Sequence, residues 1–156
     1  MIEQRKLTRQ EIIRLINEAP DAETRNLKRF IAELNNNAVK RMDAYDFFEA
    51  FGIDYFGLLT NGRPIYMAIL TLNDDDDLEF WTVSIKDPKY VLSLCKYVKR
   101  ELVKWVEKYG EIFATMEKDA SDENKKWTEW IGFHRYKEDN DTITFRIANK
   151  ILQGAT

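Results

Sequence analysis

Apolar residues recur at helical spacing in the first part of the chain. Thr8 and Glu11 have the spacing of a capping box and precede a short apolar run, which predicts a helix. Pro20 and Asp21 end it and begin a second helix, whose apolar residues over 27–34 form one face. We expect this second helix to end in the run of three asparagines at 35–37.

The pattern changes to extended runs of β-branched and aromatic residues in the middle and at the end of the chain. Predicted strands cover residues 55–60, 64–72, 78–85, 111–117, 131–137 and 142–149, with an Asn61-Gly62 hairpin turn between the first two. Short helices are predicted over 43–52 and 121–130. The longest helix is predicted from Asp87 as its cap and Pro88 as its first residue to a stop at Gly110.

The order of these elements predicts the fold class. A strand–helix–strand crossover over residues 78–117 implies one parallel pair of strands in an otherwise antiparallel sheet. We therefore expect an α+β protein with a mixed, mostly antiparallel sheet flanked by helices. The length of 156 residues favours a single domain over residues 1–156.

Composition and charge exclude several classes of protein. Hydrophobic residues make up 44% of the chain and charged residues 33%, which is typical of a globular protein. The apolar runs are too short to cross a bilayer, and the first ten residues lack the apolar core of a signal peptide. The lone Cys95 excludes an internal disulfide. We expect no membrane partner.

The net charge of −3 argues against a broad nucleic-acid surface, so there is no strong nucleic-acid signal. A local basic face remains on the longest predicted helix, formed by Lys96, Lys99, Arg100 and Lys104. Because glutamates lie among these residues, a solvated helix face is the simpler interpretation. The sequence leaves the role of this basic face open.

Two short motifs, taken together with the order of the elements, are similar to those of a known protein family. Ile131-Gly132-Phe133 follows the last predicted helix, and Asp87-Pro88-Lys89-Tyr90 stands at a strand-to-helix turn. In this order and spacing they resemble the GCN5-related N-acetyltransferase (GNAT) family, whose members place Leu-Gly-Phe and Asp/His-Pro-x-Tyr there. The resemblance covers roughly residues 7–149. It implies a GNAT-like domain and an acetyltransferase-like site for acetyl-CoA.

The turn that would hold the pyrophosphate departs from this family. The family has Arg/Gln-x-x-Gly-x-Gly/Ala, whose glycines let backbone N–H groups approach the phosphates. Here Leu92 and Leu94 stand at the glycine positions, and Val91 replaces the basic or amide side chain. We expect this helix start to pack into the protein, so that the CoA site is degenerate and no cofactor binds.

The expected proton donor is also replaced. The family's general acid is a tyrosine shortly before Leu-Gly-Phe, and Thr128 takes that position here. A threonine hydroxyl is a much poorer acid than a phenol. Tyr136 is the nearest alternative, but it falls on a predicted strand. No catalytic residue is therefore expected.

A narrower resemblance concerns small GNAT-like proteins of bacteriophages, a set that includes an internal virion protein of T7-like podoviruses. It rests on Gly62-Arg63-Pro64-Ile65, on Phe80-Trp81-Thr82 and on the turn without glycine. It implies a catalytically degenerate virion or assembly component in the virion or host cytoplasm. Its partners would be proteins, among them other virion proteins, and a host-directed protein-binding factor is a further possibility.

The alternative hypothesis is an active acyl-CoA-dependent N-acetyltransferase with an atypical turn, so the sequence leaves open whether the protein is an enzyme. In that case acetyl-CoA is the cofactor, and the cofactor-binding residues are the strand backbone at Thr82, Val83 and Ser84 together with Lys89 and Lys96. Glu49, near the region that supplies a base in some GNAT folds, would then be catalytic. The sequence identifies no acceptor substrate.

Other chemistry-bearing residues have simpler interpretations. The aspartates at 74–77 lack the spacing of a calcium loop and are expected to form a solvated hairpin tip. His134 has no second histidine for a zinc site and is expected on a strand face. We expect no metal site.

Overall fold

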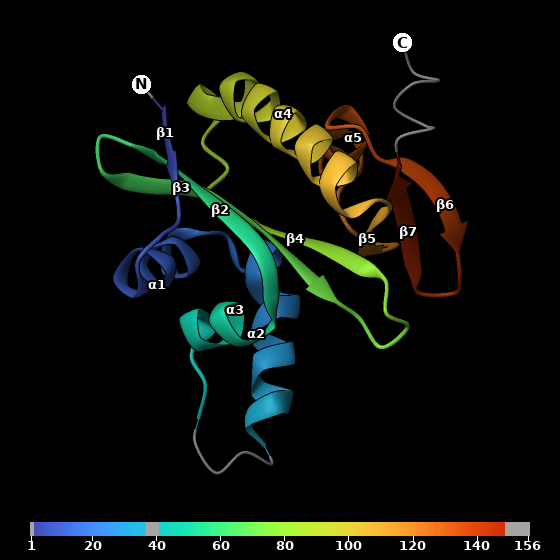
Figure 1. Ribbon diagram of the computed structural model, residues 1–156, viewed down its shortest axis with the longest axis horizontal. Helices are drawn as coiled ribbons and strands as arrows, with labels where there is room; N and C mark the ends of the chain where they lie inside the picture. The colour runs from blue at the N-terminus through green and yellow to red at the C-terminus, as the bar shows by residue number, and fades with distance from the viewer. Residues whose placement is uncertain (1, 37–40, 149–156) are drawn as a thin grey trace. The chain divides into compact units, whose positions relative to one another are not determined.

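The computed structural model describes residues 2–36 and 41–148, and Figure 1 shows its helices and strands. In chain order these are β1 (Ile2–Arg5), α1 (Arg9–Glu18), α2 (Asp21–Asn35), α3 (Ala44–Phe51), β2 (Gly52–Thr60), β3 (Arg63–Leu72), β4 (Leu78–Ser84), the 3-10 helix η1 (Pro88–Tyr90), α4 (Val91–Tyr109), β5 (Ile112–Glu117), α5 (Asp122–Trp130), β6 (His134–Glu138) and β7 (Thr142–Ile147). The predicted ends at residue 37 and at residue 149 lie outside the described residues.

The strands of the described residues form one sheet in the order β1-β2-β3-β4-β5-β7-β6. The pair β4–β5 is parallel, and β1–β2, β2–β3, β5–β7 and β6–β7 are antiparallel. The predicted α+β class and the crossover through the long helix are therefore confirmed. The strand β1 was not predicted.

The chain forms two compact units that divide within β4. The first contains described residues 2–36, 41–71 and 81–88, and the second contains residues 72–80 and 89–148. The parallel pairing of β4 with β5 joins Leu78 to Ile112 and Glu79 to Phe113. The first part of β4 thus belongs to the second unit and the rest to the first. The expectation of a single domain stays a prediction.

In the first unit, α1 and α3 begin at capping boxes. The Thr8–Glu11 box is the predicted one, and an unpredicted box joins Asp43 to Asp46 at the start of α3. The apolar faces of these helices contribute to a buried cluster that also includes β2 and β3 residues. Its members are Leu7, Ile12, Leu15, Ile16, Ala19, Leu27, Phe47, Phe48, Tyr55, Leu59, Met67, Ile69 and Val83. The hairpin turn has φ of 51° at Asn61 and 77° at Gly62, as a type I′ turn requires.

In the second unit, the Phe80 side chain of β4 packs against aromatic rings from α4 and from the segment after α5. Its ring centroid lies 6.2 Å from that of Trp105 in α4 and 5.4 Å from that of Phe133, which follows α5. In β7, Ile143 and Phe145 are buried, while the alternate residues are half-buried. The strands therefore have a buried face and a more open face.

The backbone conformation between Ile131 and Phe133 explains why residue 132 is a glycine. Gly132 has φ of 121°, in a region that side chains disfavour, and its two neighbours are buried. A left-handed residue here turns the chain from α5 into β6 while both flanking side chains enter the core. Within the described residues, no helix is both long and apolar enough to span a bilayer.

Candidate active site

The turn from β4 into α4 differs from the predicted one. The predicted cap at Asp87 with Pro88 as first helical residue is wrong, because Pro88 begins η1 and α4 starts only at Val91. The N-cap of α4 is Tyr90, whose side chain makes no capping hydrogen bond. Upstream, Lys86 has φ of 56°, and its backbone N–H donates to Ser84 Oγ at 3.1 Å. The chain thus makes a left-handed bend and a 3-10 turn before α4.

The two leucines of the first turn of α4 have opposite environments. Leu94 is 4% exposed and belongs to the core, whereas Leu92 is 69% exposed. The expectation that this helix start packs into the protein is therefore wrong for Leu92, because residues two apart on a helix point to different sides. The first N–H groups of a helix have no partner within the helix and favour anions. In α4 the Tyr90 side chain makes no capping hydrogen bond to these N–H groups.

The other residues predicted to contact acetyl-CoA lie along this segment. Thr82 and Ser84 are half-buried in β4, and Val83 between them is 2% exposed in the core of the first unit. Beyond the bend, Lys89 and Lys96 are exposed, and Lys89 Nζ lies 5.5 Å from the ring centroid of Tyr90. The lysines thus lie on either side of the start of α4.

Glu49 has a structural partner. Its Oε1 accepts a hydrogen bond from the Tyr55 hydroxyl at 2.7 Å. Burial is the main cause that raises the pKa of Tyr55, and the hydrogen bond to Glu49 raises it further. Nearby, bonds from the Asp43 backbone and from Arg9 hold the pKa of Asp46 below its usual value. These two carboxylates are therefore held by contacts within the first unit, and the role of Glu49 as a base stays a prediction.

Glu79 is a candidate base that the sequence reasoning missed. Burial raises its pKa, although a hydrogen bond from the Thr115 side chain opposes the shift. The other carboxylates with a resolved shift, among the described residues, all have lowered pKa values: Glu11, Glu18, Asp46 and Asp139. A carboxylate with a raised pKa accepts protons better near neutral pH. In the sequence, Glu79 stands beside Phe80 and Trp81 in a mostly apolar strand. This placement is the signal from which the candidate base could have been found.

Glu79 stands at one end of a row of four residues across the second unit. Neighbouring strands pair Glu79 with Phe113, Phe113 with Arg146, and Arg146 with His134. Directly paired residues point to the same face of a sheet, so this row lies on the more open face. Tyr136 joins it, with its ring centroid 5.6 Å from that of Phe113 and 4.5 Å from the Arg146 guanidinium carbon. The face presents an acid, two aromatic rings and a cation.

The threonine at the expected position of the proton donor is occupied within its own helix. Thr128 is buried, and its Oγ1 donates to the Asn124 carbonyl at 2.9 Å. Its hydroxyl proton is therefore engaged by a backbone carbonyl of the same helix. Tyr136 is 49% exposed on β6, so it is the accessible phenol of this face.

The remaining candidates have structural surroundings. Asn73 Oδ1 accepts from the backbone N–H groups of Asp75 and Asp77, which orders the acidic hairpin tip. His134 is exposed on β6. Burial raises the pKa of the Cys95 thiol, which makes it a weak nucleophile. The described residues contain no cluster of metal-ligating side chains.

Comparison with known proteins adds to this geometry. No family model and no curated protein matches the sequence. Solved structures do match, among them the N-acetyltransferase PseH of Campylobacter jejuni in complex with acetyl coenzyme A. It is 17% identical with a TM-score of 0.55, and the match covers 96% of this chain and 99% of that one. The GNAT domain of S. lividans PAT is 10% identical with a TM-score of 0.60, covering 94% of this chain and 89% of that one.

The protein has the GNAT fold. A third match is the aminoglycoside acetyltransferase AAC(6′)-Ib in complex with coenzyme A and kanamycin, with 12% identity, a TM-score of 0.61 and coverage of 99% and 98%. Identities this low concern the fold alone. These neighbours are N-acetyltransferases, and they lend no support to the narrower resemblance to phage virion proteins.

Proposed function

We propose that this GNAT-fold protein is an acyl-CoA-dependent N-acetyltransferase with an atypical pyrophosphate turn. The observation that carries the proposal is Glu79, a half-buried carboxylate with a raised pKa on the strand that leads to the α4 turn. An acetyltransferase must remove a proton from its amine acceptor, and a base of this kind suits the task. The resemblance to acetyltransferases bound to acetyl-CoA or CoA supports the same function.

The residues of the turn fit an acyl-CoA. The first N–H groups of α4 lack a side-chain cap from Tyr90 and are suited to an anion such as a pyrophosphate. Lys89 and Lys96 would add positive charge on either side, as point charges rather than a preformed cradle. The backbone of Thr82 to Ser84 would hold the pantetheine arm. When bound, acetyl-CoA would supply an activated acetyl thioester.

The proposed role of Glu79 is proton removal. Its carboxylate would accept a proton from the acceptor's ammonium group, which would free the nitrogen lone pair for the acetyl group that acetyl-CoA supplies. The bond from that acetyl group to sulfur would break, and coenzyme A would leave as its thiol with the second proton of the nitrogen. The rings of Phe113 and Tyr136 on the same face provide an apolar surface, and the Arg146 guanidinium already lies over the Tyr136 ring. The rings would pack against the apolar part of an acceptor, with its charged nitrogen toward Glu79. In this scheme Glu49 acts in structure and not in catalysis.

Calorimetry with acetyl-CoA tests the proposal. We expect micromolar binding that weakens at least tenfold when Lys89 and Lys96 are both changed to Glu. The matched control changes Lys126 and Lys137, which are exposed elsewhere, to Glu and should bind as the wild type does. The variant Glu79→Gln should keep the affinity for acetyl-CoA and lose acetyl transfer. No heat and no thermal shift at millimolar acetyl-CoA would overturn the proposal.

A second candidate function is the catalytically degenerate protein-binding component, with a phage virion or assembly role. The burial of the Thr128 hydroxyl within α5 favours it, since the usual proton donor is then missing. Its distinguishing test is mass spectrometry of purified virions. This chain at stoichiometric copy number, together with no acetyl-CoA binding, would favour the degenerate protein over the enzyme.

A further inference from the structure

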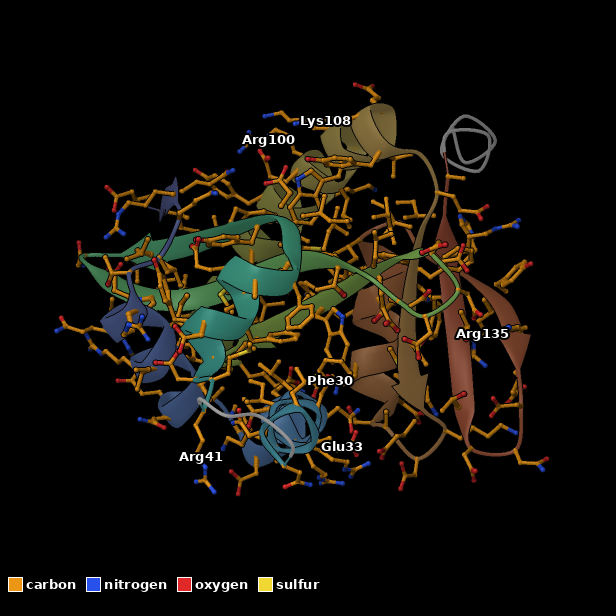
Figure 2. All side chains as sticks on the ribbon, turned by 60° about the horizontal axis from the view of Figure 1, so that its bottom comes forward. Phe30, Glu33, Arg41, Arg100, Lys108 and Arg135 are labelled. Carbon is orange, nitrogen blue, oxygen red and sulfur yellow. The ribbon has the colours of Figure 1, made fainter. Side chains whose placement is uncertain are left out.

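The outer side of α4 carries a row of cations at a regular spacing. Lys96, Arg100, Lys104 and Lys108 follow one another every four residues, and all four are exposed. Lys99 lies beside them and is exposed as well. We call these five residues the α4 basic stripe. With a rise of about 1.5 Å per residue, the stripe from residue 96 to residue 108 is about 18 Å long. Figure 2 shows Arg100 and Lys108 extending outward from this helix.

The stripe concentrates positive charge in an acidic chain. Helix α4 contains five cations and two glutamates, a net charge of +3, while the whole chain has a net charge of −3. The rest of the chain therefore carries −6. One of the two glutamates, Glu101, is buried and already paired with Lys104 at 3.0 Å. The other, Glu107, is the exposed acid of the helix.

The helix offsets the charge of the stripe in part, through the pair of Lys104 with Glu101. Like charges four residues apart repel one another and destabilise a helix. Three such pairs follow in succession along the stripe, from 96 to 100, from 100 to 104 and from 104 to 108. Among the described residues, Lys96 and Lys99 have no carboxylate within 4.0 Å. An external anion would remove this repulsion.

Two cations of the stripe are placed against tyrosine rings. The Arg100 guanidinium carbon lies 4.7 Å from the ring centroid of Tyr97, and Lys108 Nζ lies 5.0 Å from that of Tyr109. Both rings are half-buried. Contacts of this kind restrain long side chains and reduce the entropy lost when a ligand binds.

The chemistry of the stripe selects among anionic partners. Protein interfaces are depleted in lysine at their centre, and this face is mainly lysine. Binding into a membrane surface needs apolar side chains beside the charges, but the large exposed apolar residue of α4 is Leu92, before the stripe begins. A row of cations that winds gradually around the helix, by about 40° at each step of four residues, can follow the phosphate backbone of a nucleic acid.

We propose that the α4 basic stripe binds the phosphate backbone of a nucleic acid; Lys96, which the proposed acetyl-CoA site shares, is left unchanged in the test. The test measures fluorescence anisotropy of a labelled 20-nucleotide single strand, and of its duplex, at 50 and 200 mM salt. The stripe variant combines Lys99→Gln, Arg100→Gln and Lys108→Gln, which leaves Lys104 to pair with Glu101. The control combines Arg25→Gln, Lys126→Gln and Lys137→Gln. Each set changes the net charge from −3 to −6.

We expect the wild type to bind at least one of the two forms with micromolar affinity at 50 mM salt. The stripe variant should bind at least tenfold more weakly. For a single strand the slope of log K against log salt should fall in magnitude by about 2, since each cation contributes roughly 0.7. The control should stay within twofold of the wild type. The thermal shift caused by acetyl-CoA should be the same in all three proteins.

Three results would overturn the proposal. One is the absence of saturable binding up to 100 µM protein at 50 mM salt. Another is an equal loss of affinity in the control, which would show that total charge and not the stripe is responsible. A third is equally tight binding of a poly-glutamate peptide or of phosphatidylserine vesicles, which would indicate a different class of partner. Because acetyl-CoA binding is measured separately, its failure would not affect this outcome.

Discussion

The Leu7 side chain lies directly against the backbone of Gly57 in β2. A Cβ atom at this position would lie 2.3 Å from Leu7 Cγ, 2.4 Å from its Cδ2 and 2.9 Å from its Cδ1. Leu7 is 3% exposed and follows β1, which pairs with β2. A methyl group here has no room unless Leu7 leaves its site. We therefore expect Gly57→Ala to lower the free energy of unfolding by about 1–3 kcal/mol, the usual cost of overpacking.

A double-mutant cycle tests this cause. Leu7→Ala alone should cost about 2–5 kcal/mol, because it removes buried apolar volume. In the double variant the new methyl group enters the space that Leu7 leaves. The double variant should then be about as stable as Leu7→Ala, so that the two costs fail to add by about 1–3 kcal/mol. Urea unfolding followed by far-UV circular dichroism measures all four proteins.

Gly62 provides the control for the cycle. It has φ of 77°, and a Cβ added to it would meet open space, so Gly62→Ala should cost about 1–2 kcal/mol through its backbone alone. Its cost should add to that of Leu7→Ala. Additive costs for Gly57→Ala and Leu7→Ala would refute the contact between these residues, and with it the placement of the segment that joins β1 to α1.

Three further predictions concern the candidate site. Burial raises the pKa of Glu79, so its charged form destabilises the fold, and this penalty grows as pH rises from the ordinary glutamate pKa through the raised one. Glu79→Gln should therefore be more stable than the wild type at pH 7 and equal to it at pH 3, in urea unfolding at both pH values. Leu92→Ala should change the free energy of unfolding by less than about 0.5 kcal/mol, whereas Leu94→Ala should cost about 2–5 kcal/mol; equal costs would contradict their opposite exposures. Thr128→Val should cost about 0.5–1.5 kcal/mol through its lost bond to Asn124 and leave acetyl transfer intact, and a loss of transfer would show that this hydroxyl is catalytic.

Periodicity was sufficient for most of the fold. The capping box at Thr8 and the hairpin at Asn61-Gly62 were predicted because each depends on neighbouring residues, and the parallel crossover was predicted from the order of the elements. The strand β1 was missed because its residues show no alternation: Ile2 is half-buried and the next three are exposed. Its structure comes from pairing with β2, which no local pattern reveals.

The candidate site was harder to predict from the sequence. Replacement of glycine by leucine was interpreted as a filled site, but the sequence did not show that α4 begins at Val91 or that Leu92 points outward. Glu79 was missed because a carboxylate reveals its pKa only through its surroundings. Those surroundings include Thr115, which lies 36 residues further along the chain.

The charges on the two outermost described strands have a consequence for the behaviour of the protein at high concentration. β1 and β6 stand at the ends of the sheet order, and unpaired strand edges invite pairing with other chains. β6 exposes all five of its residues, among them Arg135 and Lys137, and β1 exposes Glu3 and Arg5. Pairing of two β6 edges would bring the cations Arg135 and Lys137 of the two copies together and remove them from water, whereas β1 presents both signs of charge. The charges on β6 thus disfavour growth of the sheet from that edge, and their loss would weaken this barrier.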